Sequence, residues 1–310
     1  MTTAARAGAP AAWSLSRSPA LALMLAALFW SASFVVARAV RDDIDPVLVT
    51  FVRWLLALLI FAPFVWRDVR CSLPAIRREW RLITALGLTG LALFHPLVFL
   101  AVRYTTATNA LITLSLAPVA IMLGASFLSR TRPSAHQVGG TLVSLTGAVV
   151  LLTRGDVAHI ITAGFNRGDL VMLVAVVVWA VYSLLLRRRP ADLSPTVTLV
   201  ASIVPALPVL LVFTLAAGPA VAMTFSPSLV LAVAYIVVFA TVLSFMFWSH
   251  GVAEMGPSRA GQFIHLMPVF GAALAFVFLG EPLHLAEVAG AALVFAGLVL
   301  IEDRRSPKAA

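Results

Sequence analysis

The chain has 310 residues, of which 61% are hydrophobic and only 11% charged, and its mean hydropathy is +1.02. Soluble globular domains carry about 25% charged residues, so this composition excludes a soluble domain and predicts a helical membrane protein with several spans. The net charge of +9 is the difference between 22 basic and 13 acidic residues. All but one of the basic residues are arginines, and they lie mostly in short segments between apolar runs. That distribution is typical of membrane topology and argues against a nucleic-acid-binding surface.

Ten apolar runs follow one another along the chain, each close to the roughly 20 residues that a membrane-spanning helix needs. Five of them fall within residues 20–152 and five within residues 169–302. We therefore expect an all-α membrane protein of ten transmembrane helices. The runs lie near residues 20–40, 46–66, 82–102, 107–128, 135–152, 169–186, 196–217, 228–249, 258–279 and 283–301.

The segments outside these runs are short. Residues 1–19 form an alanine-rich tail that leads into a full-length apolar run without a small-residue cleavage site, so we expect an uncleaved first helix. Residues 303–310 form a second tail, and residues 153–168 connect the two groups of runs. Besides 153–168, only residues 67–80 are long enough for an extended loop, and their lone Cys71 excludes a disulfide framework.

The second group of runs repeats the landmarks of the first at an offset of 149 or 150 residues. An odd number of spans in each copy would insert the second copy upside down, and inverted repeats are typical of alternating-access transporters. The sequence therefore predicts two inverted five-helix repeats. The matched pairs are Trp30 and Trp179, Arg38 and Arg187, Pro46 and Pro195, Pro118 and Pro268, Pro133 and Pro282, Gly140 and Gly290, and Gly147 and Gly297.

Loop charge predicts the orientation. If the N-terminus is cytoplasmic, the inside segments hold sixteen basic residues and the outside segments five, so both termini are expected in the cytoplasm. The repeat agrees, because segment 38–46 carries three acids whereas its counterpart 187–195 carries three arginines and one acid. Short loops and the lack of a targeting segment favour a bacterial inner membrane.

Ionisable side chains inside spans are costly and are candidates for function. No Asp or Glu lies well inside a run, which disfavours a relay of carboxylates for proton coupling. Arg53 lies about 10 Å into its helix and is a candidate partner for a substrate carboxylate, or else a structural arginine. Its counterpart in the second copy is Ser202.

Two histidines lie beside prolines in the middle of apolar runs. His95 precedes Pro96, which removes a helical hydrogen bond and favours a kink that presents the imidazole to a cavity. His265 lies three residues before Pro268 on the same helix. For both histidines the alternative is a neutral ring that is hydrogen-bonded inside the bundle.

Aromatic side chains supply most other candidates. Trp30 and Trp179 are related by the repeat and lie mid-span, away from the interface that tryptophan prefers, so we expect them to face each other across a cavity. Core packing is the alternative for each aromatic residue. The residues expected to contact substrate are His95, Trp179, Trp30, Tyr182, Phe94, Phe99, Arg53, Asn109, Gln262, His265 and Trp248. The residues expected to act as hinges are Pro96, Pro118 and Pro268.

Signatures of other protein classes are missing from the sequence. It holds no phosphate-binding glycine loop, no H-E-x-x-H motif and no nucleophile elbow, so we expect neither an enzyme nor a bound cofactor or metal. Glycines at seven-residue spacing in the fifth and tenth runs predict a close-packing face. This face favours a homodimer and packing within the bundle equally.

Four segments carry a pattern seen in a known family. They are 28–34 with Pro46 and Arg53, 99–107, 116–119, and 278–282 with Gly290 and Gly297. Together they resemble the EamA family of the drug/metabolite transporter superfamily. That resemblance implies a ten-helix carrier of small metabolites with a central cavity, and the mid-span aromatics with His95 are most similar to aromatic amino-acid exporters of the YddG type. The first copy departs from the family by carrying Arg132 in place of the acid in the Glu-Pro pair, which the inverted charge pattern explains.

The first hypothesis is therefore an alternating-access exporter of amino acids, aromatic or large and apolar by preference. Its partners would be a small-molecule substrate and the lipid bilayer, and no nucleic acid. A second hypothesis is multidrug efflux, although lipophilic cations would favour an intramembrane carboxylate. A third is a non-transporting sensor or partner subunit, which the repeat disfavours. Energy coupling stays open between facilitated diffusion and a histidine-linked proton.

Overall fold

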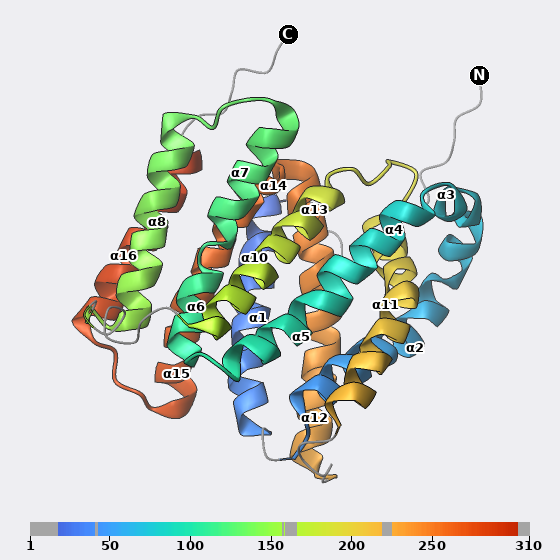
Figure 1. The fold of residues 1–310 in the computed structure, drawn as a ribbon, viewed down its shortest axis with the longest axis horizontal. Coiled ribbons are helices and arrows are strands. Elements are labelled where there is room, and N and C mark those ends of the chain that lie inside the picture. The colour runs from blue at the N-terminus through green and yellow to red at the C-terminus, as the bar shows by residue number, and fades with distance from the viewer. Residues whose placement is uncertain (1–17, 41–42, 157, 159–165, 219–224, 303–310) are drawn as a thin grey trace.

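The computed structural model describes residues 18–40, 43–156, 158, 166–218 and 225–302. Its elements within these ranges are all helical, and they pack side by side in one bundle (Figure 1). Nine helices in the described residues are long and apolar enough to cross a membrane. The tenth expected span, Leu285–Ile301, is an apolar helix that falls just short of that length.

The first half of the bundle contains nine helical segments in the described residues, because α3 precedes its third span and two of its spans are interrupted. The third span changes to a π-helix at its middle, and the fourth breaks at Ser115 and Leu116. In chain order the segments are α1 (Pro19–Ala39), α2 (Pro46–Cys71), α3 (Leu73–Arg78), α4 (Trp80–Leu86), η2 (Gly87–Leu93), α5 (Phe94–Val102), α6 (Ala107–Leu114), α7 (Ala117–Ser129) and α8 (Ala135–Thr153), where η2 is the π-helical turn.

The second half repeats this plan. A π-helical segment again interrupts its third span, and a short 3-10 turn interrupts its fourth. The segments are α10 (Arg167–Leu186), α11 (Pro195–Ala217), α12 (Pro227–Tyr235), the π-helical η3 (Ile236–Leu243), α13 (Ser244–Met255), α14 (Pro257–Gln262), the 3-10 turn η4 (Phe263–His265), α15 (Leu266–Leu279) and α16 (Leu285–Glu302).

The segment 67–80, expected as an extended loop, is helical instead. Helix α2 continues to Cys71, and α3 follows directly after Ser72. Ala75 of α3 is buried in a small apolar cluster with Ile83, Leu193 and Val197, so the segment gains a packed face that an extended loop would lack. Its arginines lie on the exposed side.

The two halves of the chain share helix starts, π-helical turns and helix breaks at equivalent positions. Helices α2 and α11 both begin with a capping side chain, Asp45 or Ser194, followed by a proline at the first helical position. The π-helices η2 and η3 begin 149 residues apart, at Gly87 and Ile236. Proline lies in the first turn of α7 and of α15, directly after the break in each span, where its missing N–H costs least.

Glycines join the ends of the two repeats. A Cβ on Gly140 would lie 2.6 Å from the carbonyl oxygen of Gly297, and a Cβ on Gly147 would lie 2.6 Å from that of Gly290. The pairing is reciprocal, because Cβ atoms on Gly290 and Gly297 would in turn meet the oxygens of Gly147 and Gly140. Helices α8 and α16 therefore run antiparallel in backbone contact, and this glycine face packs within the chain.

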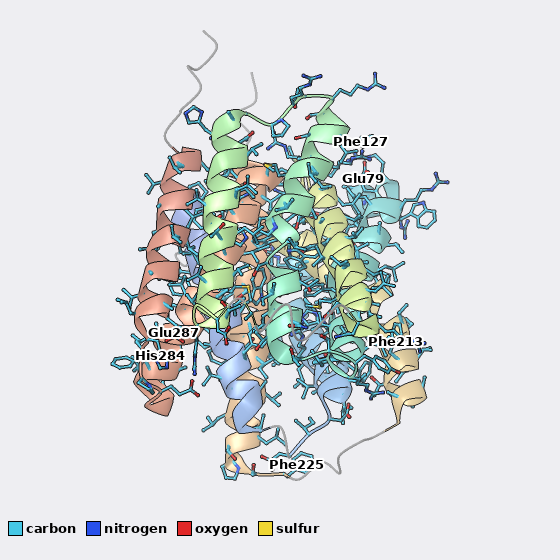
Figure 2. All side chains as sticks on the ribbon, turned by 60° about the vertical axis from the view of Figure 1, so that its left-hand side comes forward. Glu79, Phe127, Phe213, Phe225, His284 and Glu287 are labelled. Atoms are coloured by element: carbon cyan, nitrogen blue, oxygen red, sulfur yellow. The ribbon has the colours of Figure 1, made fainter. Side chains whose placement is uncertain are left out.

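Basic segments gather at one end of the bundle. The connections from α2 to α4, from α7 to α8 and from α10 to α11, each of which carries at least two arginines, lie at the top of Figure 1. In Figure 2, Glu79 and Phe127 mark this end, while Phe225, His284 and Glu287 lie at the opposite end. The exposed apolar side chains between the two ends suit a lipid environment.

The glycine contact predicts a stability difference between two substitutions in one helix. Gly147→Ala should destabilise the protein by about 1–3 kcal/mol, because the added methyl group meets backbone atoms that cannot move aside. The matched control is Gly139→Ala in the same helix, where a Cβ has no neighbour within 4 Å. Thermal unfolding of the purified protein in detergent measures both, and equal melting temperatures would contradict the described packing.

Candidate functional site

A cavity of about 180 Å³ lies at the centre of the bundle. It extends from the middle of α1 and α10 toward the end of the molecule where α1 stops and α2 begins. Its wall is mostly apolar and aromatic, with a small polar group of side chains on α1, α2 and α5. The lining residues are Trp30, Ser33, Phe34, Ala37, Val49, Thr50, Arg53, Phe94, His95, Val98, Phe99, Leu114, Trp179, Ile236, Phe245, Ile264 and Met267.

A cluster of aromatic rings forms the inner wall of this cavity. The repeat-related Trp30 and Trp179 contact each other edge to face, with ring centroids 5.4 Å apart. Phe94 lies 5.0 Å from Trp179, and Phe245 lies 5.7 Å from Trp30. These distances are typical of attractive aromatic pairs, so the inner wall is a rigid apolar surface.

The π-helical segment η3 holds one side of this cluster in place. The indole Nε1–H of Trp30 donates a hydrogen bond to the carbonyl oxygen of Ala240, within η3, at 3.0 Å. A π-helical turn departs from the regular α-helical ladder, which leaves carbonyl groups available to a side chain of a neighbouring helix. This bond fixes the orientation of the Trp30 ring at the cavity wall.

Arg53 and His95 form the polar end of the cavity wall. The Arg53 Nη2 atom lies 2.8 Å from Nε2 and 3.2 Å from Nδ1 of His95. Arginine can only donate, so the ring nitrogen that faces it accepts the bond without a proton of its own. Arg53 also lies over the ring of Trp54, with its guanidinium carbon 5.3 Å from the ring centroid.

No carboxylate of the described residues forms an ion pair with Arg53. Its side chain is only 9% exposed, and its Nε atom has no hydrogen-bond partner in the same part of the chain. A buried cation is stabilised by an opposite charge and by filled donor positions. The site therefore has the chemistry of an anion-binding position.

Six of the eleven predicted substrate contacts line the cavity, namely Trp30, Arg53, Phe94, His95, Phe99 and Trp179. Tyr182 and Trp248 support the inner wall from behind, with ring centroids 5.2 and 5.5 Å from that of Trp179. The buried Asn109 and Gln262 lie on α6 and α14 and do not line this cavity.

His265 also lies outside the cavity wall and is fully buried. Its Nε2–H donates to the carbonyl oxygen of Ser115 at 2.8 Å, and its Nδ1 lies 2.7 Å from Oγ of Ser144, which acts as the donor in the neutral ring. Residues 115 and 265 are equivalent in the two repeats, so this bond joins the two helix breaks. The arrangement matches the alternative of a histidine bonded inside the bundle.

Two aromatic residues of the site escaped the sequence analysis. Phe245 lines the cavity and contacts Trp30, Trp179 and Tyr182, while Trp54 lies behind it with ring centroids 5.0 Å apart. The repeat could have pointed to Phe245, because it lies 149 residues after Pro96, which was already a candidate beside His95. For Trp54 the sequence holds no indication other than its position next to Arg53.

Comparison with known proteins agrees with this architecture. The model of the EamA-like transporter family matches residues 17–153 and 166–302. A solved structure shares the fold with a TM-score of 0.72, at 22% identity over 91% of this chain and 95% of its own.

Three relatives of similar sequence are named as transporters, exporters or efflux pumps. An uncharacterized transporter of Archaeoglobus fulgidus is 28% identical, covering 84% of this chain and 89% of its own length. A probable terminal-alkyne amino-acid exporter of Streptantibioticus cattleyicolor is 27% identical, with 91% and 93% covered. A probable amino-acid metabolite efflux pump of Salmonella typhimurium is 26% identical, with 92% and 95% covered.

The two histidines should respond differently to substitution. His265→Leu leaves Ser115 and Ser144 without their partner and should lower stability by about 1–3 kcal/mol. His95→Leu, at the cavity wall, should lower transport while the melting temperature changes less. Thermal unfolding of both variants, together with their rates of solute transport, tests this. A greater loss of stability in His95→Leu than in His265→Leu would contradict the structural role of His265 and the cavity role of His95.

Proposed function

Because this chain belongs to the EamA-like transporter family, we propose that it exports amino acids with aromatic or large apolar side chains through the central cavity by alternating access. The observation that carries the proposal is Arg53, a buried cation at the wall of an aromatic cavity. The family and the named relatives are transporters, so the protein is a transporter and not an enzyme.

Charge supports a carboxylate as the bound group. The guanidinium of Arg53 contacts the neutral ring of His95 and the face of Trp54, and neither of these compensates its charge. A carboxylate would accept two parallel hydrogen bonds from the guanidinium, which is the geometry that arginine binds best. His95 would hold Arg53 in position and supply a further polar contact.

Size and polarity support a small metabolite with an apolar side chain. Sites for drug-sized ligands occupy about 300–1,000 Å³, and this cavity of about 180 Å³ is smaller. The rings of Trp30, Trp179, Phe94 and Phe245 would cover an aromatic or long aliphatic side chain. The same small volume and the cation in the wall disfavour efflux of large lipophilic cations.

Two relatives support export of amino-acid-like compounds through the words in their names, amino-acid exporter and amino-acid metabolite efflux pump. The reciprocal glycine contacts of α8 and α16 and the matched π-helices support ten spans in two inverted repeats. The basic end of the bundle supports cytoplasmic termini, in what would be a bacterial inner membrane.

Coupling to a proton gradient would need a titratable group in the route. Carboxylates of the described helices lie near their ends, such as Asp169 in the first turn of α10 and Glu287 in the first turn of α16. Export down a metabolite gradient is therefore the simplest mechanism, with His95 as the one titratable contact in the cavity wall besides Arg53.

Counterflow in proteoliposomes tests the function. Vesicles with purified protein and unlabelled phenylalanine inside should accumulate external labelled phenylalanine, tryptophan or methionine without a pH gradient. Accumulation only with a pH gradient would instead indicate proton coupling. Failure to move any amino acid by folded protein would overturn the proposal and leave drug efflux or a non-transporting role.

Arg53→Gln tests the carboxylate contact. Losing charge-assisted hydrogen bonds worth about 1.5–3 kcal/mol should lower phenylalanine counterflow about 10- to 100-fold. The control is Arg78→Gln, because Arg78 is exposed and pairs with Asp192 far from the cavity, and this variant should transport normally. Normal transport by Arg53→Gln would remove Arg53 from the site.

Trp179→Ala tests the aromatic wall. Removing this ring should abolish selectivity for aromatic substrates, because Trp179 contacts Trp30, Phe94 and Phe245 at once. Trp179→Phe should retain most transport, since it keeps an aromatic surface. Competition by unlabelled amino acids in the counterflow assay measures selectivity, and unchanged competition in Trp179→Ala would contradict the assignment.

A further inference from the structure

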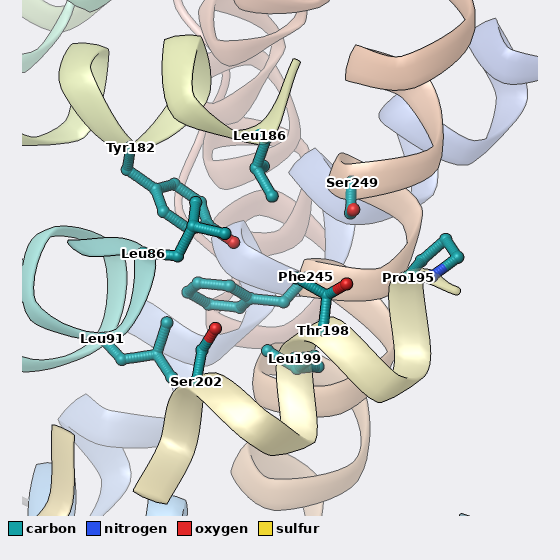
Figure 3. Close-up of a pocket in the computed structure, with 10 residues that line it drawn as sticks. All are labelled: Leu86, Leu91, Tyr182, Leu186, Pro195, Thr198, Leu199, Ser202, Phe245 and Ser249. Atoms are coloured by element: carbon teal, nitrogen blue, oxygen red, sulfur yellow. The ribbon is translucent and has the colours of Figure 1, made fainter. Parts of the chain in front are cut away.

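A second, much smaller cavity lies on the other side of the aromatic cluster (Figure 3). Its volume is about 10 Å³, close to that of one water-sized probe. It is bounded by α4, η2, α10, α11 and α13, on the side of the basic end of the bundle. Its lining residues are Leu86, Leu91, Tyr182, Leu186, Pro195, Thr198, Leu199, Ser202, Phe245 and Ser249.

Hydroxyl groups line this closed space. Ser202 and Ser249 are 2% and 6% exposed, and their Oγ atoms have no hydrogen-bond partner in the described part of the chain. Figure 3 shows the hydroxyl of Tyr182 and that of Ser202 both turned toward the ring of Phe245. Buried polar groups normally have partners, so two unpartnered hydroxyls beside one space indicate a site where polar atoms enter.

The repeat relates the two cavities to each other. Half of the lining of the small cavity consists of repeat counterparts of residues that line the large one. The small cavity is therefore the equivalent, in the second repeat, of the large cavity in the first. The pairs are Tyr182 with Ser33, Leu186 with Ala37, Thr198 with Val49, Leu199 with Thr50, and Ser202 with Arg53.

Phe245 separates the two spaces, because it lines both. Its ring contacts Trp30 and Trp54 on one side and Tyr182 on the other, with the Tyr182 centroid 5.9 Å away. A rotation of α13 or α10 that moved this ring would join the large cavity to the small one.

We propose that the small cavity is the closed cytoplasmic half of the substrate route, and that Tyr182, Ser202 and Ser249 bind the polar end of the substrate there when it opens. The proposal rests on the proposed transport function. If the two repeats exchange conformations, α10 and α11 open a space beside η2 that is equivalent to the large cavity that α1 and α2 now line. The substrate would then meet neutral hydroxyls first and the charge of Arg53 second.

Cysteine accessibility tests this assignment. Ser202→Cys and Ser249→Cys are made separately in a Cys71→Ser background. Each variant that thermal unfolding shows to be folded enters the assay, whether or not its phenylalanine counterflow is slowed. Inside-out membrane vesicles are treated with a small charged methanethiosulfonate reagent, with and without phenylalanine. Both cysteines should react from the cytoplasmic side, and phenylalanine should change their rates severalfold. The exposed Cys71 of the unsubstituted protein reports on which side the reagent acts.

Ser183→Cys is the matched control. Ser183 is fully buried on α10 beside Tyr182, but its hydroxyl bonds to the Trp179 carbonyl and it does not line the cavity. It should stay unreactive. Unreactive Ser202→Cys and Ser249→Cys in folded protein would overturn the route and leave the transport function of the unsubstituted protein standing, as would equal reaction of all three. Substrate-independent reaction of Ser202→Cys and Ser249→Cys would overturn the binding role.

The same data separate the two proposals. A wild-type protein that moves no amino acid refutes the proposed function by itself, whatever the labelling shows. Transport together with selective labelling supports both. Selective labelling that responds to phenylalanine supports the cytoplasmic half-site even in a variant whose slow transport hides turnover.

Discussion

Backbone contact between α8 and α16 is the constraint on which the rest of the bundle depends. Helices in lipid gain little by burying apolar faces against one another, so close approach and shape decide which of them associate. The four glycines at this contact leave no room for side chains, which brings the last helix of each repeat together antiparallel. The two matched halves of the chain therefore meet through their last helices.

Equivalent positions of the two halves also contact each other near the centre of the bundle. Trp30 meets Trp179, and Ser115 meets His265, each pair formed from equivalent positions of the two halves. The halves are not identical where they line the two cavities, however. The position of Arg53 in one half is held by Ser202 in the other, so of these two cavities only the large one has an arginine in its wall.

Much of the fold and part of the site were predictable from the sequence, because they follow from the repeat and from local chemistry. The matched Pro118 and Pro268 predicted the breaks in the fourth span of each half, and the matched tryptophans predicted the ring contact at the centre. The π-helical turns in the third spans were not predicted. The histidines were harder, since both lie near a mid-span proline and only the rotation of each helix decides which ring meets the cavity. The helical α3 was missed because its one buried residue, Ala75, gives no periodic signal.

The π-helical segments have a consequence for how this site tolerates change. A wider turn holds an additional residue, and one residue in a helix turns the following face by about 100°. The face that α5 presents, with Phe94 and His95, is therefore set by the number of residues in η2 as much as by their side chains. Substitutions within η2 keep this residue count, apart from those at Gly87 and Gly90, where a side chain would clash with α11 or with Tyr182. A single-residue deletion, by contrast, would rotate the imidazole away from Arg53. The geometry of the cavity wall is thus encoded by a count of residues, which an amino-acid profile of the segment does not reveal.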